Sequence, residues 1–249
     1  MSKWSEPQEW PALGAEQVHV WLAHLPSQRA HAPRFLEVLS PQELERAGRF
    51  RFETLRERAH FTRGILRLLL SRYVKTPPRE ITFIENAHGK PGIERPPGTG
   101  LFFNMSHSGE HAAWAITRLG EVGVDIEQAR DDMSRLENIA RRYFAPGEQK
   151  QLSALPKSEQ TRGFFELWTR KEAFVKARGD GLFSGLDQFE VSLADARLLS
   201  INLEDAGHWW MSALPPLPGY AGAVVVKTPS CNRAGEAGHS STNVPRLPS

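Results

Sequence analysis

Predicted helices and strands come in two successive blocks along the 249 residues of this chain. A helix-rich block ends near residue 75 and short strands follow it, and a second helix-rich block ends near residue 178 and strands follow again. Regular alternation of single strands and helices would instead build a parallel sheet. The order therefore predicts an α+β fold, and no sequence repeat relates its two blocks.

The first helical block is strongly basic. Ser40, Pro41 and Glu43 have the spacing of a capping box with proline in the first turn, which predicts a helix start. Side chains suited to a core then recur at helical spacing at Leu55, Ala59, Thr62, Leu66, Leu69 and Tyr73. Eight arginines lie in the same segment: Arg46, Arg49, Arg51, Arg56, Arg58, Arg63, Arg67 and Arg72. One helix face is therefore expected in a core and most arginines on the other, up to a stop at Pro77 and Pro78.

The remaining elements are predicted from alternation, turn residues and helical spacing. Strands are expected at residues 81–84, 101–103, 111–117, 122–127, 189–193, 208–213 and 220–227. Helices are expected at residues 134–144, 147–155 and 160–178. Residues 104–109 are interpreted as a turn at a strand end. Leu119 and Gly120 are interpreted as the turn of a hairpin that joins 111–117 to 122–127.

Composition limits the classes of protein that this chain can belong to. It has 31 Lys and Arg against 29 Asp and Glu, a net charge of +2, and 40% hydrophobic residues, which excludes disorder as its overall state. No apolar run approaches the roughly 18 to 20 residues of a membrane helix, and the N-terminus has no signal-type stretch, so a soluble cytoplasmic protein is expected. Its one cysteine, Cys231, excludes a disulfide framework and a thiolate metal cluster.

Two carboxylates lie side by side on a predicted strand. In residues 122–127, strand alternation places Asp125 and Glu127 on the face opposite the valines and the isoleucine. Neighbours on one face of a strand are roughly 7 Å apart. A solvated strand face explains this pattern, and so does a site for a hard divalent cation, which prefers carboxylate oxygens.

The predicted helix at 160–178 carries charges next to its apolar stripe. Lys171 falls inside the stripe, whereas Glu172 and Lys176 lie along its edge. One interpretation is that Lys171 snorkels and that Glu172 and Lys176 form an ordinary surface pair. The other is that this edge borders a site, where Glu172 adds a third carboxylate to the two on the strand. Three such oxygens from two elements would suit Mg²⁺ bound together with a phosphate.

Two polar turns add candidate ligands for an anion. Ser106, His107 and Ser108 could present hydroxyls and an imidazole, and Lys90 lies in a Gly-Lys-Pro-Gly turn. Each turn can equally be explained without a ligand, as a polar turn that hydrogen-bonds its own backbone or as a Gly/Pro turn that exposes a lysine. In combination with the carboxylates, the two lysines and the arginine-rich helix, however, these groups are what a magnesium-dependent site for a highly phosphorylated ligand requires.

Three of these segments resemble the signatures of one enzyme family. FNMSHS at residues 103–108, GVDIE at 123–127 and WTRKEAFVK at 168–176 look like the motifs of the 4'-phosphopantetheinyl transferases of the surfactin-synthetase type. The resemblance covers about residues 15 to 227 and includes Arg56 and residues 49–52, 63–67, 89–91, 144–148, 179–182 and 219–221. It implies a monomer of two similar α+β halves, related by a pseudo-two-fold axis, with the active site between them.

The same resemblance implies an activity and a metal ion. Such enzymes transfer the phosphopantetheine arm of coenzyme A to a serine of a carrier protein and release adenosine 3',5'-bisphosphate. By resemblance, Asp125, Glu127 and Glu172 would hold Mg²⁺, which Mn²⁺ could replace, against the pyrophosphate. The proton of the carrier serine would go to Glu172 or to a metal-held water oriented by Glu127, and Asp125 and Glu172 are expected to be exposed.

Binding roles for cationic and polar side chains are implied as well. Lys176 would bind the pyrophosphate and stabilise the departing bisphosphate, and Lys171 is assigned to coenzyme binding beside it. His107 and Ser106 would contact phosphate oxygens, which gives His107 a catalytic role. Lys90 would lie along the nucleotide. The 3'-phosphate is assigned to two arginines of the basic segment, Arg56 and Arg63.

The predicted halves are residues 1–103, with the nucleotide contacts, and 104–227, with the metal and the catalytic groups. Residues 228–249 are rich in proline, serine, asparagine and glycine and are expected to be disordered. An acidic carrier would dock on the second half near the helix after Phe144, and arginines could steer it there. The acceptor could belong to fatty-acid, polyketide or peptide synthesis. A monomer without nucleic-acid or membrane partners is expected.

Two other functions remain open at this level. A nucleic-acid-binding module could use the eight arginines along a phosphate backbone, but the net charge is only +2 and no recognised nucleic-acid motif is present. A magnesium-dependent hydrolase of nucleotides or phosphate esters would also use clustered carboxylates and a lysine. Such a hydrolase would act on coenzyme A without a carrier protein, whereas a transferase needs one.

Overall fold

The structure is a computed structural model of the chain, and it describes residues 11–130, 132–179, 181, 185–201, 207–229 and 241–243. Cys231, most of the predicted tail, and Asp180 and Leu182 of the 179–182 segment lie outside the described residues. Within the described residues, no helix is long and apolar enough to cross a membrane.

The first half runs from β1 to β5. Its elements are β1 (Gln17–His24), η1 (Pro26–His31), α1 (Ala32–Glu37), α2 (Pro41–Gly48), α3 (Glu53–Val74), η2 (Pro78–Glu80), β2 (Thr82–Glu85), β3 (Pro91–Arg95), β4 (Phe102–Ser108) and β5 (His111–Thr117). The helix start predicted at Ser40 is confirmed, since Ser40 Oγ accepts from Glu43 N and the Glu43 carboxylate accepts from Ser40 N.

The second half runs from β6 to β10. Its elements are β6 (Val122–Gln128), α4 (Met133–Tyr143), α5 (Pro146–Ser153), α6 (Lys157–Arg178), η3 (Leu186–Gln188), β7 (Phe189–Val191), β8 (Leu198–Ile201), β9 (His208–Ala213) and β10 (Tyr220–Thr228). A short strand, β11 (Ser241–Asn243), lies in the region predicted as a tail and pairs with β1.

The two halves repeat one order of elements. Each begins with a strand, continues through helices to a 22-residue helix, α3 or α6, and a short 3-10 helix, and ends with two pairs of strands. The strand orders match as well, because β1-β5-β4 in the first sheet corresponds to β6-β10-β9 in the second. The predicted α+β fold of two similar halves is confirmed, and the repeat is structural, since the sequence shows none.

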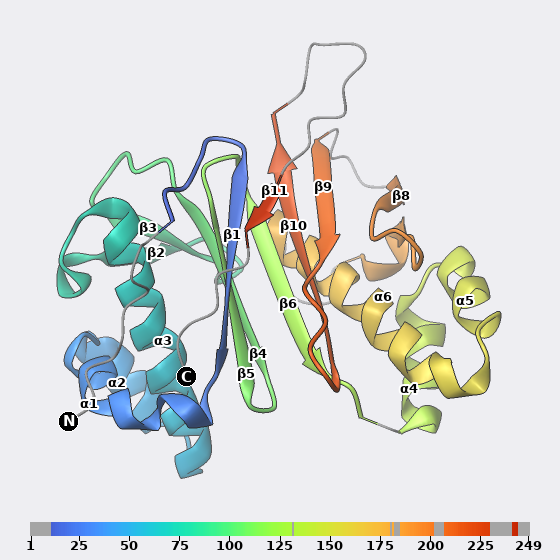
Figure 1. The fold of residues 1–249 in the computed structure, drawn as a ribbon, viewed down its shortest axis with the longest axis horizontal. Helices are drawn as coiled ribbons and strands as arrows, with labels where there is room; N and C mark the ends of the chain where they lie inside the picture. The colour runs from blue at the N-terminus through green and yellow to red at the C-terminus, as the bar shows by residue number, and fades with distance from the viewer. Residues whose placement is uncertain are drawn as a thin grey trace.

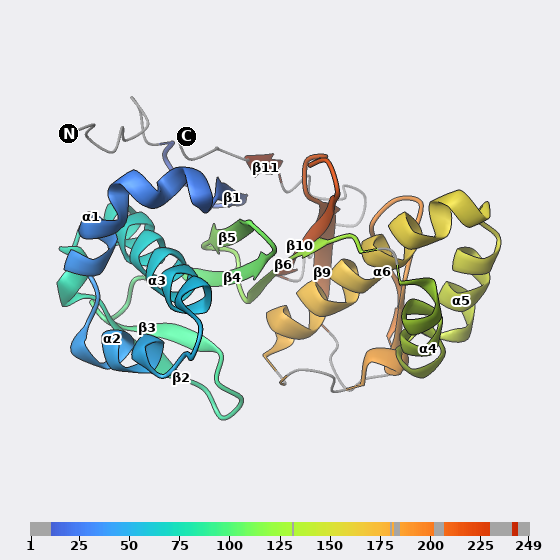
Figure 2. The same ribbon diagram turned by 90° about the horizontal axis from the view of Figure 1, so that it is seen from below.

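The two sheets face each other at the centre of the molecule and the helices lie outside them (Figure 1). Val18 and Val20 of β1 form one buried cluster with Val122 and Val124 of β6 between the sheets. The side chains that alternate with these along β1 point away from the second sheet. One of them, Trp21, belongs to the core that the first sheet forms with α3. Viewed from below, α3 and α6 lie on opposite sides of the paired sheets (Figure 2).

The predicted hairpin between 111–117 and 122–127 is wrong. β5 pairs with β1 and β4, whereas β6 pairs with β10 in the other sheet. Residues 104–108 belong to strand β4 and not to a turn, and the turn that follows is made at Gly109, with φ 54°. The hairpin was predicted from the alternation of side chains, which is the same whether β5 pairs with β6 or with β1. The strand β1 was itself not predicted. The first sheet therefore extends to Thr117, whereas the predicted boundary between the two halves lies after residue 103.

A buried ion pair occupies the same place in each half. Glu43, in the first turn of α2, accepts from Arg67 Nε at 2.7 Å, and Arg67 also donates to two backbone carbonyls in and just after η2. Glu148, in the first turn of α5, accepts from Lys171 Nζ at 2.7 Å, and Lys171 also donates to a carbonyl just after η3. Because Arg67 and Lys171 both occupy the fifteenth position of their 22-residue helix, they are structural counterparts.

Candidate active site

The two sheets meet along their edge strands, β4 and β6, through side chains of β4. Asn104 Oδ1 accepts from Val124 N at 3.0 Å, and Ser106 Oγ donates to Asp125 Oδ1 at 2.8 Å. An edge strand has backbone N–H groups that need partners, and here β4 supplies them from side chains. The Asn-x-Ser pattern of β4 therefore joins the halves and sets the position of Asp125.

Lys176 of α6 completes this cluster. Its Nζ lies 2.6 Å from Asp125 Oδ1 and 3.0 Å from Ser106 Oγ. Helix α6 can come so close because residue 123 is glycine, where a Cβ atom would lie 2.0 Å from the Ala173 carbonyl oxygen. Three elements, β4, β6 and α6, thus converge on one carboxylate oxygen.

Glu172 and Glu127 interact electrostatically with Asp125. Burial is the main reason why the pKa of Glu172 is raised to about 7, and repulsion from Asp125 adds to this shift. The positive charge of Lys176 lowers the same pKa. Burial also raises the pKa of Glu127, while a hydrogen bond of 2.5 Å from Ser108 Oγ opposes that shift. Asp125 and Glu172, predicted to be exposed, are instead buried, with 2% and 5% of their surface accessible. Burial is what makes their mutual repulsion strong, because water no longer screens it.

Two carboxylate oxygens at this site have no hydrogen-bond partner. Asp125 Oδ2 and Glu172 Oε1 are buried and make no hydrogen bond with any described residue. As the described side chains stand, no three of His, Cys, Asp or Glu are grouped closely enough to hold a metal ion. Mg²⁺ commonly takes one or two protein carboxylates and fills its shell with waters and substrate phosphates. Asp125 and Glu172 fit that donor set, whereas Glu127, the third predicted ligand, is bonded to Ser108.

His107 lies next to the cluster on β4, with Arg58 of α3 nearby. Packing around the imidazole lowers the pKa of His107, and the positive charges of Arg58 and Lys176 lower it further. Arg58 and Lys176 therefore contribute positive potential around the His107 imidazole, whose lowered pKa keeps it mostly neutral near neutral pH. Arg58 is one of eight arginines in residues 46–72, and nothing in the sequence indicates that it, rather than the other seven, lies close to His107.

The two arginines predicted for the 3'-phosphate make their described ion pairs within the first half. Arg56 lies 3.3 Å from Glu53, and its buried Nε has no hydrogen-bond partner among the described residues. Arg63 lies 3.2 Å from Glu43, and its guanidinium lies over the ring of Phe83. Arg56 Nε is thus a buried donor without a hydrogen-bond partner among the described residues, whereas Arg63 packs against α2 and the β2–β3 hairpin.

The two other lysines predicted to bind the coenzyme lie away from the cluster. Lys171 is fully buried and bonded to Glu148 in the core of the second half, so it cannot contact a coenzyme bound at Asp125. Its position inside the apolar stripe reflects this burial and not snorkelling. Lys90 pairs with Glu121, and its Nζ donates to the Ala177 carbonyl at 2.7 Å.

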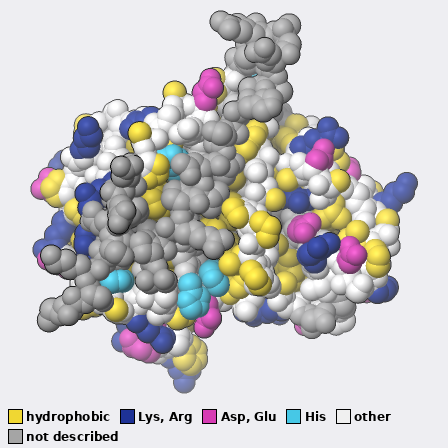
Figure 3. Space-filling model, in the orientation of Figure 1, with side chains coloured by type: hydrophobic (Ala, Val, Ile, Leu, Met, Phe, Trp, Pro, Cys, Tyr) yellow, Lys and Arg dark blue, Asp and Glu magenta, His cyan; other side chains and the backbone are white. Residues whose placement is uncertain are grey.

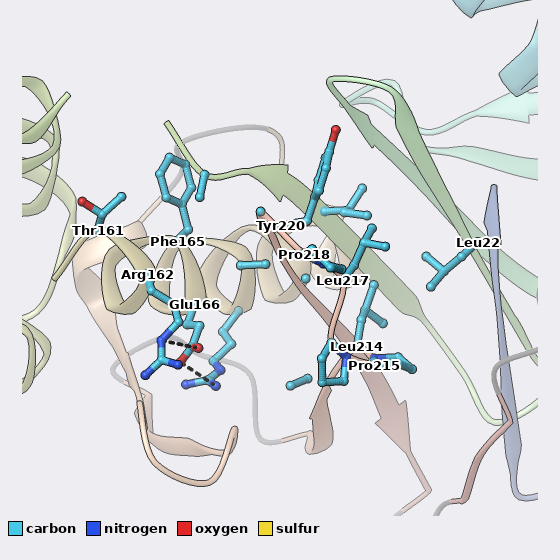
Figure 4. Close-up of a pocket in the computed structure, with 18 residues that line it drawn as sticks. Leu22, Thr161, Arg162, Phe165, Glu166, Leu214, Pro215, Leu217, Pro218 and Tyr220 are labelled. Atoms are coloured by element: carbon cyan, nitrogen blue, oxygen red, sulfur yellow. Dashed lines mark ion pairs between the residues drawn. The ribbon is translucent and has the colours of Figure 1, made fainter. Parts of the chain in front are cut away.

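A groove of 680 Å³ lies beside the turn between β9 and β10. Figure 4 shows Leu214, Leu217 and Tyr220 on one side of it and Phe165 of α6 on the other. Apolar side chains gather along the middle of this face of the molecule (Figure 3). None of the predicted site residues lines this groove, so it is separate from the cluster around Asp125.

Comparison with known proteins identifies the family to which this chain belongs. The family described as the 4'-phosphopantetheinyl transferase superfamily matches residues 121–225, and the one described as 4'-phosphopantetheinyl transferase, N-terminal, matches residues 25–118. The chain is 35% identical to the 4'-phosphopantetheinyl transferase HetI of Nostoc sp. over 86% of this chain and 89% of that protein. It is 33% identical to the 4'-phosphopantetheinyl transferase Sfp of Bacillus subtilis over 82% of this chain and 89% of Sfp. The chain therefore belongs to the 4'-phosphopantetheinyl transferase superfamily, as its motifs predicted.

Proposed function

We propose that this protein transfers 4'-phosphopantetheine from coenzyme A to a serine of an apo carrier protein, in a reaction that requires Mg²⁺ and releases adenosine 3',5'-bisphosphate. The observation that carries the proposal is the convergence of Ser106, Asp125 and Lys176 on one point between the two halves. The names of HetI and Sfp, to which the chain is similar over most of their length, support the same reaction.

The pyrophosphate of coenzyme A is bound by Lys176, Ser106 and His107. The ammonium group of Lys176 is only partly exposed, with 21% of its side chain accessible, so its charge acts on an anion with little screening. Arg58 adds positive potential beside His107. Arg56, whose side chain is 37% exposed, and Arg63 are the proposed contacts of the 3'-phosphate.

Asp125 and Glu172, with Glu127 beside them, are the proposed holders of Mg²⁺. When bound, the cation neutralises charge on the phosphoryl oxygens and on the leaving group. Manganese has similar ligand preferences and would replace it. The two unpartnered oxygens and the raised pKa of Glu172 support this assignment, because burial and repulsion from Asp125 raise that pKa and a bound cation opposes both effects.

Glu172 takes up the proton of the carrier serine as the serine oxygen bonds to the phosphorus that bears the pantetheine arm. The bond from that phosphorus to the bridging oxygen breaks, and the bridging oxygen leaves on the adenosine bisphosphate. Lys176 stabilises the charge that develops on this oxygen. The pKa of Glu172 is about 7 in the metal-free protein, and a bound cation lowers it, so the carboxylate is ionised and able to accept a proton when Mg²⁺ is present.

The acceptor is a carrier protein or carrier domain of fatty-acid, polyketide or peptide synthesis, and we expect the enzyme to act on it as a cytoplasmic monomer. Intact-protein mass spectrometry of an apo carrier, incubated with this protein, coenzyme A and Mg²⁺, tests the proposal. A gain of one phosphopantetheine that chelator prevents is the expected result. Release of adenosine bisphosphate from coenzyme A without a carrier would instead indicate a hydrolase.

A further inference from the structure

Two histidines lie directly opposite each other on neighbouring strands of the first sheet. His24, at the end of β1, pairs with His111, at the start of β5, and their ring centroids are 5.0 Å apart. Side chains at directly paired positions project from the same face of a sheet. Histidine side chains gather at one place low on the face shown in Figure 3, next to an acidic side chain. The pair lies at the end of the sheet where a turn joins β4 to β5.

Glu110, in that turn, adds a carboxylate to the histidine pair. Its Oε2 lies 3.3 Å from His24 Nε2. Its backbone is held on two sides, because its carbonyl accepts from Leu25 N at 2.8 Å and its N–H donates to the Tyr220 hydroxyl at 3.1 Å. Tyr220 comes from the second half, and its ring also packs against that of His111 with centroids 4.6 Å apart. The backbone of the turn is therefore fixed from both halves of the molecule.

One ring nitrogen of His111 lacks a partner. His111 Nδ1 is buried and makes no hydrogen bond with any described residue. A buried polar atom without a partner is costly, so a ligand that satisfies it stabilises the protein. Burial lowers the pKa of His111, His24 lowers it further, and Glu110 opposes the shift. The imidazole is therefore mostly neutral near neutral pH, and the neutral form is the one that binds a metal ion.

We propose that His24, His111 and Glu110 bind a transition-metal cation of the Zn²⁺ class, at a site separate from the one proposed for Mg²⁺. Imidazole nitrogens together with a carboxylate oxygen suit Zn²⁺, whereas Mg²⁺ prefers oxygen ligands alone. Ligand atoms at about 2.0–2.1 Å from a tetrahedral Zn²⁺ lie about 3.3 Å from one another. His24 Nε2 and Glu110 Oε2 already have this separation, at 3.3 Å. This inference does not depend on the proposed transfer reaction, because it concerns binding alone.

The site closes on the cation by rotation of side chains. As they stand, the described side chains form no group of three that could hold a metal ion. His24 is 43% exposed and Glu110 is 67% exposed, so packing does not prevent either from turning toward the ring of His111. The backbone does not need to move, since strand pairing already places the two histidines opposite each other. The bound cation then joins β1 to the turn between β4 and β5.

Isothermal titration calorimetry of the full chain with Zn²⁺ tests the proposal, with excess Mg²⁺ present to occupy the carboxylates around Asp125. We expect one Zn²⁺ to bind per chain. The dissociation constant should rise at least about tenfold in His24→Gln and in His111→Gln, and at least about threefold in Glu110→Gln, because an amide is a poorer ligand for Zn²⁺ than an imidazole or a carboxylate. His208→Gln removes an exposed histidine from β9 and is the matched control, which should bind as wild type does.

Thermal unfolding supplies a second readout that does not depend on activity. Excess Zn²⁺ should raise the Tm of wild type and of His208→Gln but not that of His24→Gln, and circular dichroism checks that each variant is folded. Wild-type affinity in either His24→Gln or His111→Gln would overturn the proposal, as would a wild-type protein that binds no Zn²⁺. Binding that is lost in Cys231→Ser but kept in the histidine variants would place the cation at the thiol and would also overturn it.

Discussion

Lys171 Nζ lies 2.7 Å from Glu148 Oε1, and neither side chain of this ion pair is exposed. Burial lowers the pKa of Lys171 and raises that of Glu148, and the attraction between the two charges opposes both shifts. The pair has a counterpart in the first half, where Arg67 lies 2.7 Å from Glu43. Buried charges at equivalent positions show that the structural repeat extends from the strand order to individual side chains.

Lys171→Met is expected to lower the free energy of unfolding by about 3 to 5 kcal/mol, because Glu148 is left as a buried charge without its partner. Urea unfolding followed by circular dichroism measures this. The double variant Lys171→Met with Glu148→Gln should lose at least about 1 kcal/mol less than the sum of the two single losses. Lys157→Met, at an exposed site of the same helix, should change stability by less than about 0.5 kcal/mol. Equal losses at positions 171 and 157 would contradict the structural role.

The helices were predictable because their signals are local. The capping box at Ser40 and the helical spacing before residue 178 depend on neighbours in the chain, and both predictions hold. Strand pairing is not local. β5 pairs with β1, about 90 residues earlier in the sequence, and alternation says nothing about which strand is the partner.

The candidate site was predictable in its motifs and not in its environment. Strand alternation correctly placed Asp125 and Glu127 on one face, opposite Val124, but it could not show that Asp125 is buried. Lys171 lies beside Glu172 in the sequence and faces a different environment, since it points into the core. Arg58 could not be chosen from eight arginines, because its closeness to His107 depends on how α3 packs beside β4.

The raised pKa of Glu172 predicts a pH-dependent penalty on stability. In the unfolded chain this carboxyl ionises near its usual value of 4.5, and in the folded protein near 7. Its contribution to stability is therefore fully present below pH 4.5 and is lost as the pH rises to 7, a change of about 3 kcal/mol. Glu172→Gln cannot ionise, so it should be more stable than wild type by about that amount at pH 8 and equally stable near pH 4.5. Urea unfolding of wild type and Glu172→Gln in the presence of chelator measures the free energy of unfolding at each pH. If the stability difference between the two proteins did not vary with pH, burial would not raise the pKa of Glu172.

Divalent cations should stabilise the protein through Asp125 and Glu172. With coenzyme A present, Mg²⁺ at about 100 times its dissociation constant should add about 2.7 kcal/mol to the free energy of unfolding. Thermal unfolding with and without Mg²⁺ should show this gain in wild type but not in Asp125→Asn or Glu172→Gln. Glu159→Gln, an exposed carboxylate on the same helix, should retain the full gain. A gain that persists in Asp125→Asn would place the cation elsewhere.

Replacing Arg58 should affect coenzyme binding alone, whereas replacing Arg63 should also affect stability. Arg58→Ala is expected to raise KM for coenzyme A several-fold without a change in stability, because Arg58 acts on the region around His107 and Lys176. Arg63→Ala should also lower stability by about 1 kcal/mol, because Glu43 loses one of its two cationic partners. Kinetics and urea unfolding of both variants, with the exposed Arg29→Ala as control, separate these effects. A wild-type KM in Arg58→Ala would remove Arg58 from the site.

The separation of β6 and α6 should be fixed by Gly123. A Cβ atom at this position would lie 2.0 Å from the Ala173 carbonyl oxygen and 2.4 Å from the Ala177 nitrogen, and backbone atoms cannot rotate away as a side chain can. Gly123→Ala is therefore expected to cost at least about 3 kcal/mol of stability, above the usual range for a single added methyl group. Gly48→Ala, at the end of α2, meets no atom within 4 Å and should instead add about 0.5 to 1 kcal/mol. If Gly123→Ala kept wild-type stability, α6 could move away from β6, and the contact of 2.6 Å between Lys176 and Asp125 would not be fixed by the packing of these two elements.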